Sequence, residues 1–258
     1  MVFARQYDRV TDLQHHARRA ASFHSAADAY DAARPGYPAA ALSWMVPDEA
    51  RSILDLGAGT GKLTESLVAP GRQVFAVDPS SEMLRVLASK LPTVEARVGG
   101  GEDIPLPDMS VDAVTVAQAW HWMDRARAAA EIARVLRPGG ILSLVWNNDD
   151  DRVPWVRELG GVDAEETPRV RPAADGDAEP IEGFHAGEAA GFEWVRRLTR
   201  EEFIAYECSV SAFLVAREEE QRARVAYLHE VLERHPEIVH DGHIAYPVFT
   251  FVLRYCRT

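Results

Sequence analysis

The chain has 258 residues, 47% of them hydrophobic and 26% charged, which is typical of a globular protein and excludes disordered and fibrous classes. Its formal net charge of −12 at pH 7 disfavours binding to phosphate backbones, so we expect no nucleic-acid partner. No apolar run is long enough for a membrane span and no secretory signal is recognisable, so we expect no membrane partner. The two cysteines, Cys208 and Cys256, suit a reducing compartment, and we therefore predict a cytoplasmic protein.

The first 48 residues predict a helical N-terminal extension, distinct from the main domain at 49–258. Pro35 and Pro38 interrupt helical structure in this extension, and Pro38 can open a short helix over Ala39–Val46. The segment Ala29–Pro38 contains two tyrosines and an arginine among mostly small residues.

From residue 49 onward, short apolar runs alternate with helical patterns. The predicted strands are Ser52–Leu56, Gln73–Asp78, Val94–Val98, Val111–Ala117 and Ile141–Trp146. The predicted helices between them are Lys62–Ala69, Ser80–Leu91 and Arg125–Leu136. Because strands that are apolar throughout are buried on both faces, this alternation predicts an α/β fold with a parallel sheet between helices.

The second half of the main domain has weaker patterns. Residues 148–190 predict loops and short helices, followed by a strand over Phe192–Leu198. A capping box, Thr199-Arg-Glu-Glu202, opens a helix near Glu201–Val210. A helix over Glu218–Arg234 and a closing strand over Ala245–Tyr255 follow. We therefore divide the main domain into a cofactor half, 49–147, and a variable substrate half, 148–258.

A glycine-rich loop follows the first predicted strand in the sequence Ile53-Leu-Asp55-Leu-Gly57-Ala-Gly59-Thr-Gly61-Lys62. Glycines at every second position allow a ligand to lie against the backbone at the start of a helix. The nicotinamide fingerprint has a different spacing, G-x-G-x-x-G, and a carboxylate at Asp55 favours a ligand with an ammonium group over a pyrophosphate. Asp78 ends the next strand, where a carboxylate can accept hydrogen bonds from both ribose hydroxyls.

This combination of strand, D-x-G-x-G-x-G, helix, strand and terminal Asp resembles the class I S-adenosylmethionine-dependent methyltransferases. Gly101–Pro107 is similar to the family's segment after the third strand, and Leu136–Gly140 to its turn before the fifth. Val111–Asp124 resembles the fourth strand and following loop of the type 11 small-molecule subgroup, which includes trans-aconitate methyltransferase relatives. One departure is the glycine run at 99–101, where the family more often has Asp-Ala or Ser-Ala.

The resemblance implies a Rossmann-like, doubly wound sheet of seven mostly parallel strands, helices on both faces, an antiparallel last strand and an N-terminal lid. It implies S-adenosyl-L-methionine as cofactor, with an arginine of the lid reaching the cofactor's carboxylate. Either Glu102 or Asp103 would face the adenine, and the sequence leaves that choice open. The implied cofactor-binding residues are Tyr30, Arg34, Asp55, Gly57, Ala58, Gly59, Gly61, Asp78, Pro79, Met83, Glu102, Asp103 and Gln118.

The acceptor pocket is expected where the fourth strand ends, from Trp120, His121 and Trp122. His121 is the candidate catalytic residue, as base for a hydroxyl acceptor or as hydrogen-bond donor to a carboxylate, although an aromatic triplet can also simply pack. We expect no metal, because His235, His240 and His243 lack paired ligand spacing.

The function predicted is methyl transfer to a small-molecule acceptor, at a carboxylate or hydroxyl oxygen. Two alternatives remain. One is a nicotinamide-dependent oxidoreductase, and the other is a regulatory protein that binds S-adenosylmethionine without catalysis.

Overall fold

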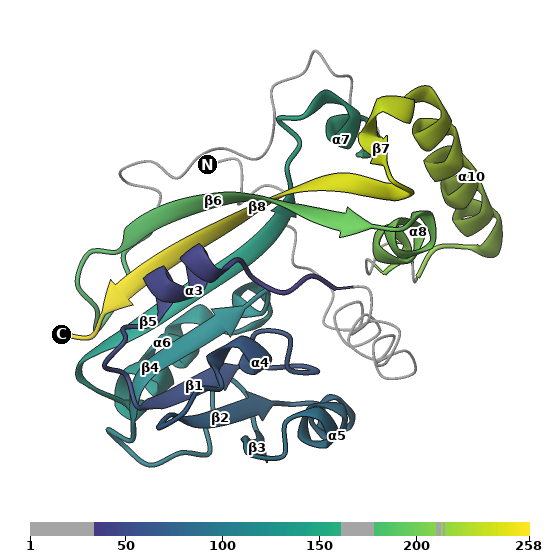
Figure 1. Cartoon of the computed structure of the whole chain (residues 1–258). Helices are drawn as coiled ribbons and strands as arrows, with labels where there is room; N and C mark the ends of the chain where they lie inside the picture. The colour runs from purple at the N-terminus through teal and green to yellow at the C-terminus, as the bar shows by residue number, and fades with distance from the viewer. Residues whose placement is uncertain (1–33, 161–177, 210–212, 214) are drawn as a thin grey trace. The chain divides into compact units, whose positions relative to one another are not determined.

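The computed structural model describes residues 34–160, 178–209, 213 and 215–258 (Figure 1). The chain forms two compact units, each assembled from separate segments. We call Gly36–Asn147, Pro172–Phe192 and Thr250–Thr258 the sheet unit, and Met1–Pro35, Asn148–Arg171 and Glu193–Phe249 the helical unit. No helix within the described residues is long and apolar enough to span a bilayer.

The strands form one mixed sheet in the order β3-β2-β1-β4-β5-β8-β6, with a short β7 paired antiparallel to β8. The strands are β1 Ser52–Leu56, β2 Gln73–Asp78, β3 Glu95–Val98, β4 Val111–Ala117, β5 Leu136–Asp149, β6 Glu188–Leu198, β7 Val239–His240 and β8 His243–Cys256. The first five pair in parallel, and the arrow of β8 points opposite to that of β4 (Figure 1). The predicted doubly wound, mostly parallel α/β fold is confirmed, and the two-residue β7 accounts for the eighth strand.

Both faces of the sheet are buried in the sheet unit, which explains why its strands are apolar throughout. Neighbouring residues of β1 enter different cores, with Leu54 in one cluster and Ile53 in the other. The helices of this unit are α3 Ala39–Met45, α4 Thr64–Leu67, α5 Ser81–Lys90, the 3₁₀ turn η2 Trp120–Trp122 and α6 Arg125–Val135. Ser80 caps α5 by accepting a hydrogen bond from the Met83 N–H.

Three elements differ from the sequence prediction by four residues or more in length. The helix α4 is shorter than predicted, because the backbone is already extended at Val68, ahead of the Pro70-Gly71 turn. The strand β5 is longer, because the predicted turn at Arg137–Gly140 lies within the strand as an irregularity. There Val111 pairs with Leu136 but Ala113 pairs with Ile141. The strand β6 begins at Glu188, four residues before the predicted start.

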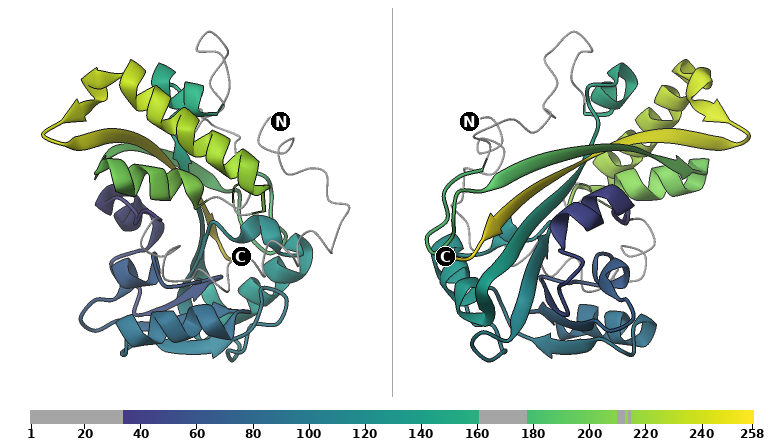
Figure 2. Two further views of the ribbon diagram at one scale, coloured as in Figure 1. Left: turned by 90° about the vertical axis from the view of Figure 1, so that its right-hand side faces the viewer. Right: turned by 60° about the vertical axis from the view of Figure 1, so that its left-hand side comes forward.

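The helical unit contains α7 Pro154–Leu159, α8 Arg200–Cys208, α10 Glu218–Arg234 and the 3₁₀ turn η3 Pro236–Ile238. The predicted capping box opens α8, with hydrogen bonds of 2.8 Å and 3.2 Å exchanged between Thr199 and Glu202. The long helix α10 packs on α7 and α8 (Figure 2), and its residues Leu228, Val231 and Leu232 are buried there. This unit therefore has its own apolar core, separate from the two cores of the sheet unit.

Candidate active site

The glycine loop between β1 and α4 has left-handed backbone at each of its three glycines. A Cβ atom at Gly57 would lie 2.5 Å from the Ala119 Cβ, so close packing with the segment after β4 excludes any side chain there. At Gly59, φ is +55° but a Cβ atom would meet nothing within 4 Å. Gly57 is thus required by packing and backbone, whereas the side of Gly59 is open to a ligand.

Asp78, at the carboxyl end of β2, fixes this loop from the neighbouring strand. Its Oδ2 accepts a hydrogen bond from the Gly59 N–H at 2.9 Å, and its Oδ1 accepts one from the Ser80 N–H at 2.8 Å. An ionised carboxylate can accept about four hydrogen bonds through its two oxygens. Asp78 can therefore organise the loop and accept ligand hydroxyls at the same time. Pro79 follows it directly, and the nearby Met83 is buried in the first turn of α5.

Asp55 is a buried acid beneath the loop. In β1 it lies opposite Thr115 of β4, whose hydroxyl donates to Oδ1 at 3.3 Å, and Thr64 of α4 donates to Oδ2 at 2.6 Å. Burial, with a smaller contribution from the negative charge of Asp78, raises the pKa of Asp55 to about 6, although both threonine hydrogen bonds oppose the shift. A cation bound nearby would favour the ionised form.

The glycine run after β3 has a packing explanation. A Cβ atom at Gly99 would lie 2.6 Å from the Pro105 Cδ, and one at Gly101 would lie 2.6 Å from the Met123 Sδ. The larger residues typical of the family would not fit beside these side chains. Glu102 accepts a hydrogen bond from the Asp124 N–H at 2.6 Å, whereas Asp103 is exposed. The structure thus ties Glu102 to the start of α6 and leaves Asp103 at the surface.

Arg134 of α6 binds the segment after β3, and it is not among the site residues predicted from the sequence. Arg134 donates to the carbonyl oxygens of Ile104 and Leu106, both at 2.9 Å, and pairs with Glu131 at 2.7 Å. Glu131 in turn accepts the Ile104 N–H at 2.9 Å, and its hydrogen bond with Arg134 lowers its pKa. The only sequence signal was an i,i+3 charge pair on a predicted helix, which is common on solvent-exposed faces.

Gln118 marks the carboxyl end of β4 by an unusual backbone. Its φ of +56° is in the left-handed region, which is uncommon for a residue with a side chain. Its N–H donates to the Val145 carbonyl oxygen and its Nε2 to the Asn147 carbonyl oxygen, both at 2.9 Å. Such strain persists only where surrounding contacts impose it, and it is concentrated at functional sites.

The aromatic triplet after β4 divides into three environments. Trp120 is buried in the core of the sheet unit, and Trp122 is 44% exposed. His121 is part-buried between them, and its ring centroid lies 4.9 Å from that of Trp122 at an interplanar angle of 44°. Trp120 therefore anchors the turn, while His121 is part-buried and Trp122 lies at the surface.

The N-terminal segment is attached to β5 near its carboxyl end, through an asparagine that also bonds the middle of β8. The Asn147 Nδ2 donates to the Gly36 carbonyl oxygen at 2.9 Å, and its Oδ1 accepts from the Thr250 hydroxyl at 2.6 Å. Asn147 was not among the predicted site residues, because nothing local distinguishes this asparagine. Arg34 belongs to the helical unit, where it donates to the Ser209 carbonyl oxygen at 3.3 Å. Tyr30 lies outside the described residues.

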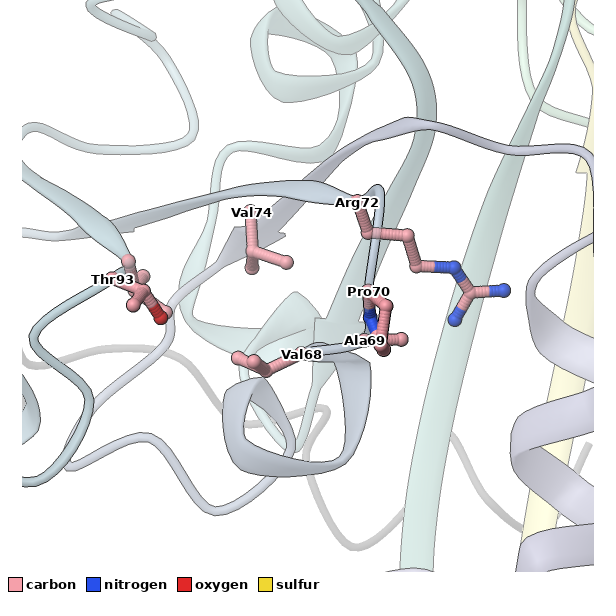
Figure 3. Close-up of a pocket in the computed structure, with 7 residues that line it drawn as sticks. Val68, Ala69, Pro70, Arg72, Val74 and Thr93 are labelled. Atoms are coloured by element: carbon pink, nitrogen blue, oxygen red, sulfur yellow. The ribbon is translucent and has the colours of Figure 1, made fainter.

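A surface pocket of about 430 Å³ lies elsewhere on the sheet unit (Figure 3). It adjoins the amino end of β2 and the turn before β3, and Figure 3 shows the Arg72 side chain extending away from its apolar neighbours. Its lining residues are Val68, Ala69, Pro70, Arg72, Val74, Thr93 and Val94. Ligands of parallel α/β sheets bind at the carboxyl ends of strands, so this pocket is not the candidate active site.

Comparisons with known proteins agree with this geometry. A family model for the methyltransferase domain matches residues 54–144. The chain is 46% identical over 233 residues to an uncharacterised methyltransferase of Mycobacterium tuberculosis, covering 90% of this chain and 94% of that protein. It is 38% identical over 223 residues to an uncharacterised methyltransferase-like protein of Schizosaccharomyces pombe, covering 83% and 87%. A candidate type II methyltransferase from Anaeromyxobacter dehalogenans has a similar structure, with a TM-score of 0.62 and 26% identity over 87% of this chain and 97% of that one.

Proposed function

Because the chain belongs to the S-adenosylmethionine-dependent methyltransferases, we propose that it methylates a small molecule at a carboxylate or hydroxyl oxygen. The observation that carries this proposal is the turn after β4, where the buried Trp120 holds His121 and Trp122 at the carboxyl edge of the sheet. A titratable imidazole beside an accessible indole suits a small acceptor with an oxygen nucleophile. The finer likeness to trans-aconitate methyltransferase relatives stays a prediction.

The chain's residues suit S-adenosyl-L-methionine. We propose that the methionine part lies along the open side of Gly59, that Asp78 accepts the ribose hydroxyls, and that Gln118 borders the methionine part. Asp55 is only 1% exposed, so we propose that it attracts the ammonium through its charge. The remaining residues that we assign to the cofactor are Tyr30, Arg34, Gly57, Ala58, Gly61, Pro79, Met83, Glu102 and Asp103.

The cofactor supplies a methyl group already activated on a sulfonium sulfur, so the chain needs no covalent intermediate. The protein's task is to orient the acceptor oxygen in line with the methyl carbon and to exclude water, which can lower the barrier by several kcal/mol. With a hydroxyl acceptor, neutral His121 would take its proton. With a carboxylate acceptor, no base is required, and His121 would donate a hydrogen bond instead.

A methyl-transfer screen tests this proposal. The protein is incubated with methyl-labelled cofactor and a panel of phenols, hydroxy acids and dicarboxylates, together with monoester and monoamide derivatives of these acids. We expect label in at least one panel member. Binding of NADH without binding of S-adenosylhomocysteine would instead support an oxidoreductase. Tight S-adenosylhomocysteine binding with no label across the panel would support a regulatory protein.

The role of His121 is tested with the acceptor that this screen identifies. For a hydroxyl acceptor, we expect His121→Ala to lower kcat by about a hundred-fold or more and to remove the rise of activity as the imidazole deprotonates. For a carboxylate acceptor, we expect a raised acceptor KM instead. Trp122→Phe is the matched control, since it keeps the imidazole and an aromatic neighbour. Unchanged kcat and KM in His121→Ala would assign this residue to packing.

A further inference from the structure

The segment 99–107, which follows β3, leaves the sheet beside Asp78, the residue that we assign to the ribose. Val98 at the end of β3 lies opposite Asp78 in the parallel register, and the Gly99 N–H donates to the Asp78 carbonyl oxygen at 3.2 Å. The acids Glu102 and Asp103 follow shortly after in the sequence. The segment is therefore within reach of the adenine of a cofactor whose ribose is bound by Asp78.

Two arginine side chains hold the later part of this segment. Three successive carbonyl oxygens accept hydrogen bonds from guanidinium groups. Arg134 donates to those of Ile104 and Leu106, both at 2.9 Å, and Arg97 donates to that of Pro105 between them. Because these carbonyl oxygens are bound to side chains and not to a neighbouring strand, the course of the backbone here depends on the two arginines.

Every N–H group of the Arg134 guanidinium is used. Besides the two carbonyl oxygens, it donates twice to Glu131, at 2.8 Å and 2.7 Å, and once to Asp108 at 2.7 Å. Glu131 also accepts the Ile104 N–H at 2.9 Å, so the Arg134–Glu131 pair binds both backbone polar groups of Ile104. A guanidinium presents its donors in a rigid fork, whereas a lysine has a single nitrogen and cannot reach the same acceptors at once.

The beginning of the segment is fixed to the other end of the same helix. Glu102 accepts a hydrogen bond at 2.6 Å from the N–H of Asp124, the residue that caps α6. Arg134 lies in the last turn of α6. Asp103 is therefore between two points that are both attached to one helix. Removing either point would let the two acids move relative to a bound base.

We propose that Arg134 is a positioning residue for adenine recognition, which holds Glu102 and Asp103 where one of their carboxylates accepts the exocyclic amine of the base. Arg134 itself does not touch the cofactor and acts only through the segment 99–107. The inference rests on the proposed binding of S-adenosyl-L-methionine and is independent of the methyl acceptor. A site built to hydrogen-bond an amine rejects an analogue that lacks it, so the strength of this rejection reports the position of the acids.

The experiment compares the binding of S-adenosylhomocysteine with that of S-inosylhomocysteine, in which an oxygen replaces the exocyclic amine. For the unchanged protein, we expect calorimetry to show a preference of about ten-fold or more for S-adenosylhomocysteine. We expect Arg134→Lys to weaken S-adenosylhomocysteine binding by about ten-fold and to leave the Kd of S-inosylhomocysteine within about two-fold, so that the preference is lost. Equal weakening of both ligands would indicate a merely structural role and would overturn the proposal.

The matched control is Arg137→Lys, the same substitution at an arginine that pairs with Asp112 instead. It should keep the preference of the unchanged protein. Glu131→Gln is a milder second variant, because its amide oxygen can still accept the Ile104 N–H while the ionic partner of Arg134 is removed. It should lose part of the preference, and if Arg134→Lys does not fold, a full preference in Glu131→Gln would overturn the proposal.

These measurements also separate the proposal from the proposed function. Equal Kd values for the two ligands in the unchanged protein would overturn the role of Arg134 while leaving the cofactor assignment intact. No binding of S-adenosylhomocysteine would contradict both. The measurements use no methyl acceptor, so a methyl-transfer screen without any labelled product would contradict the proposed function and leave this result unchanged.

Discussion

Each of the two units contains a buried carboxylic acid with a raised pKa, and the partners of that acid differ between the units. Asp55 in the sheet unit accepts hydrogen bonds from the neutral hydroxyls of Thr64 and Thr115 and from the backbone N–H of Thr64. Glu207 in the helical unit accepts from the Tyr246 hydroxyl at 2.9 Å and pairs with Arg224 at 2.7 Å. Burial raises both pKa values, to about 6 for Asp55 and about 7 for Glu207.

The difference distinguishes a site from a core. Glu207 has its cation supplied by the fold, as expected of a group that stabilises a structure. Asp55 has hydroxyl partners and lies beneath an open glycine loop, so its charge is available to a cationic ligand. The site in the sheet unit rests on local backbone geometry, whereas the helical unit relies on pairs that are distant in sequence.

The largest effect is expected from the local geometry of the loop. Gly57→Ala would place a Cβ atom 2.5 Å from the Ala119 Cβ in a left-handed conformation, so we expect a loss of about 3 kcal/mol in stability. The matched control is Gly59→Ala, which has the same backbone strain but open space. It should cost about 1–2 kcal/mol and still weaken S-adenosylhomocysteine binding. Chemical denaturation and calorimetry measure the two effects. Equal stability losses would refute the packing argument.

Removing Arg224, the cation that pairs with Glu207 in the helical unit, should lower stability by a comparable amount. Arg224→Met leaves Glu207 buried without its cation, and we expect a loss of about 3 kcal/mol at pH 8. Because Glu207 protonates as the pH falls through about 7, the loss should shrink towards pH 5. The double variant Arg224→Met/Glu207→Gln should recover much of the stability. Urea denaturation at both pH values measures this, and a loss independent of pH would contradict the assignment.

A substitution of Asp78, which fixes the glycine loop of the sheet unit, should affect ligand binding more than stability. Asp78→Ala removes the acceptor of the Gly59 and Ser80 N–H groups, and hydrogen bonds to an ionised group contribute roughly 1.5–3 kcal/mol. We expect S-adenosylhomocysteine affinity to fall by about ten-fold or more, with some loss of stability. Asp78→Asn keeps an acceptor oxygen and should lose less of both. Calorimetry with unchanged affinity in Asp78→Ala would remove it from the cofactor site.

A smaller effect concerns pH. The pKa of Asp55 is raised in the folded protein, so its contribution to stability is greatest below its ordinary pKa and is lost as pH rises through about 6. Ligand binding should run the other way, because an ammonium favours ionised Asp55. We expect S-adenosylhomocysteine affinity to rise by up to about ten-fold between pH 5 and pH 7, with proton release. Asp55→Asn should remove this dependence, whereas Glu207→Gln should leave it intact. Calorimetry in two buffers measures it.

The sequence predicted those features that are determined by residues close together in the chain. The bounds of β1, β2 and β4 and the capping box at Thr199 follow from neighbouring residues, and the structure agrees with them. The sequence could not reveal that Arg134 holds two carbonyl oxygens 28 and 30 residues away, or that Asn147 joins Gly36 to Thr250.

The residues of the candidate site also divide into those that sequence spacing identifies and those that it does not. Its glycines and Asp78 stand out by spacing, because a tight turn between strand and helix leaves few alternatives. The left-handed backbone of Gln118 and the enclosure of Asp55 depend on what packs around them. Such features become visible only when distant segments are brought together.

The position of β8 between β5 and β6 has a consequence for biosynthesis. Both neighbours emerge from the ribosome first, and residues 199–242 must be translated before β8 begins at His243. At about 5–20 residues per second this interval lasts several seconds. During it, two strands of the nascent chain have edges that can pair with other polypeptides. We therefore expect newly made chains to depend on chaperones that shield strand edges until the sheet can close.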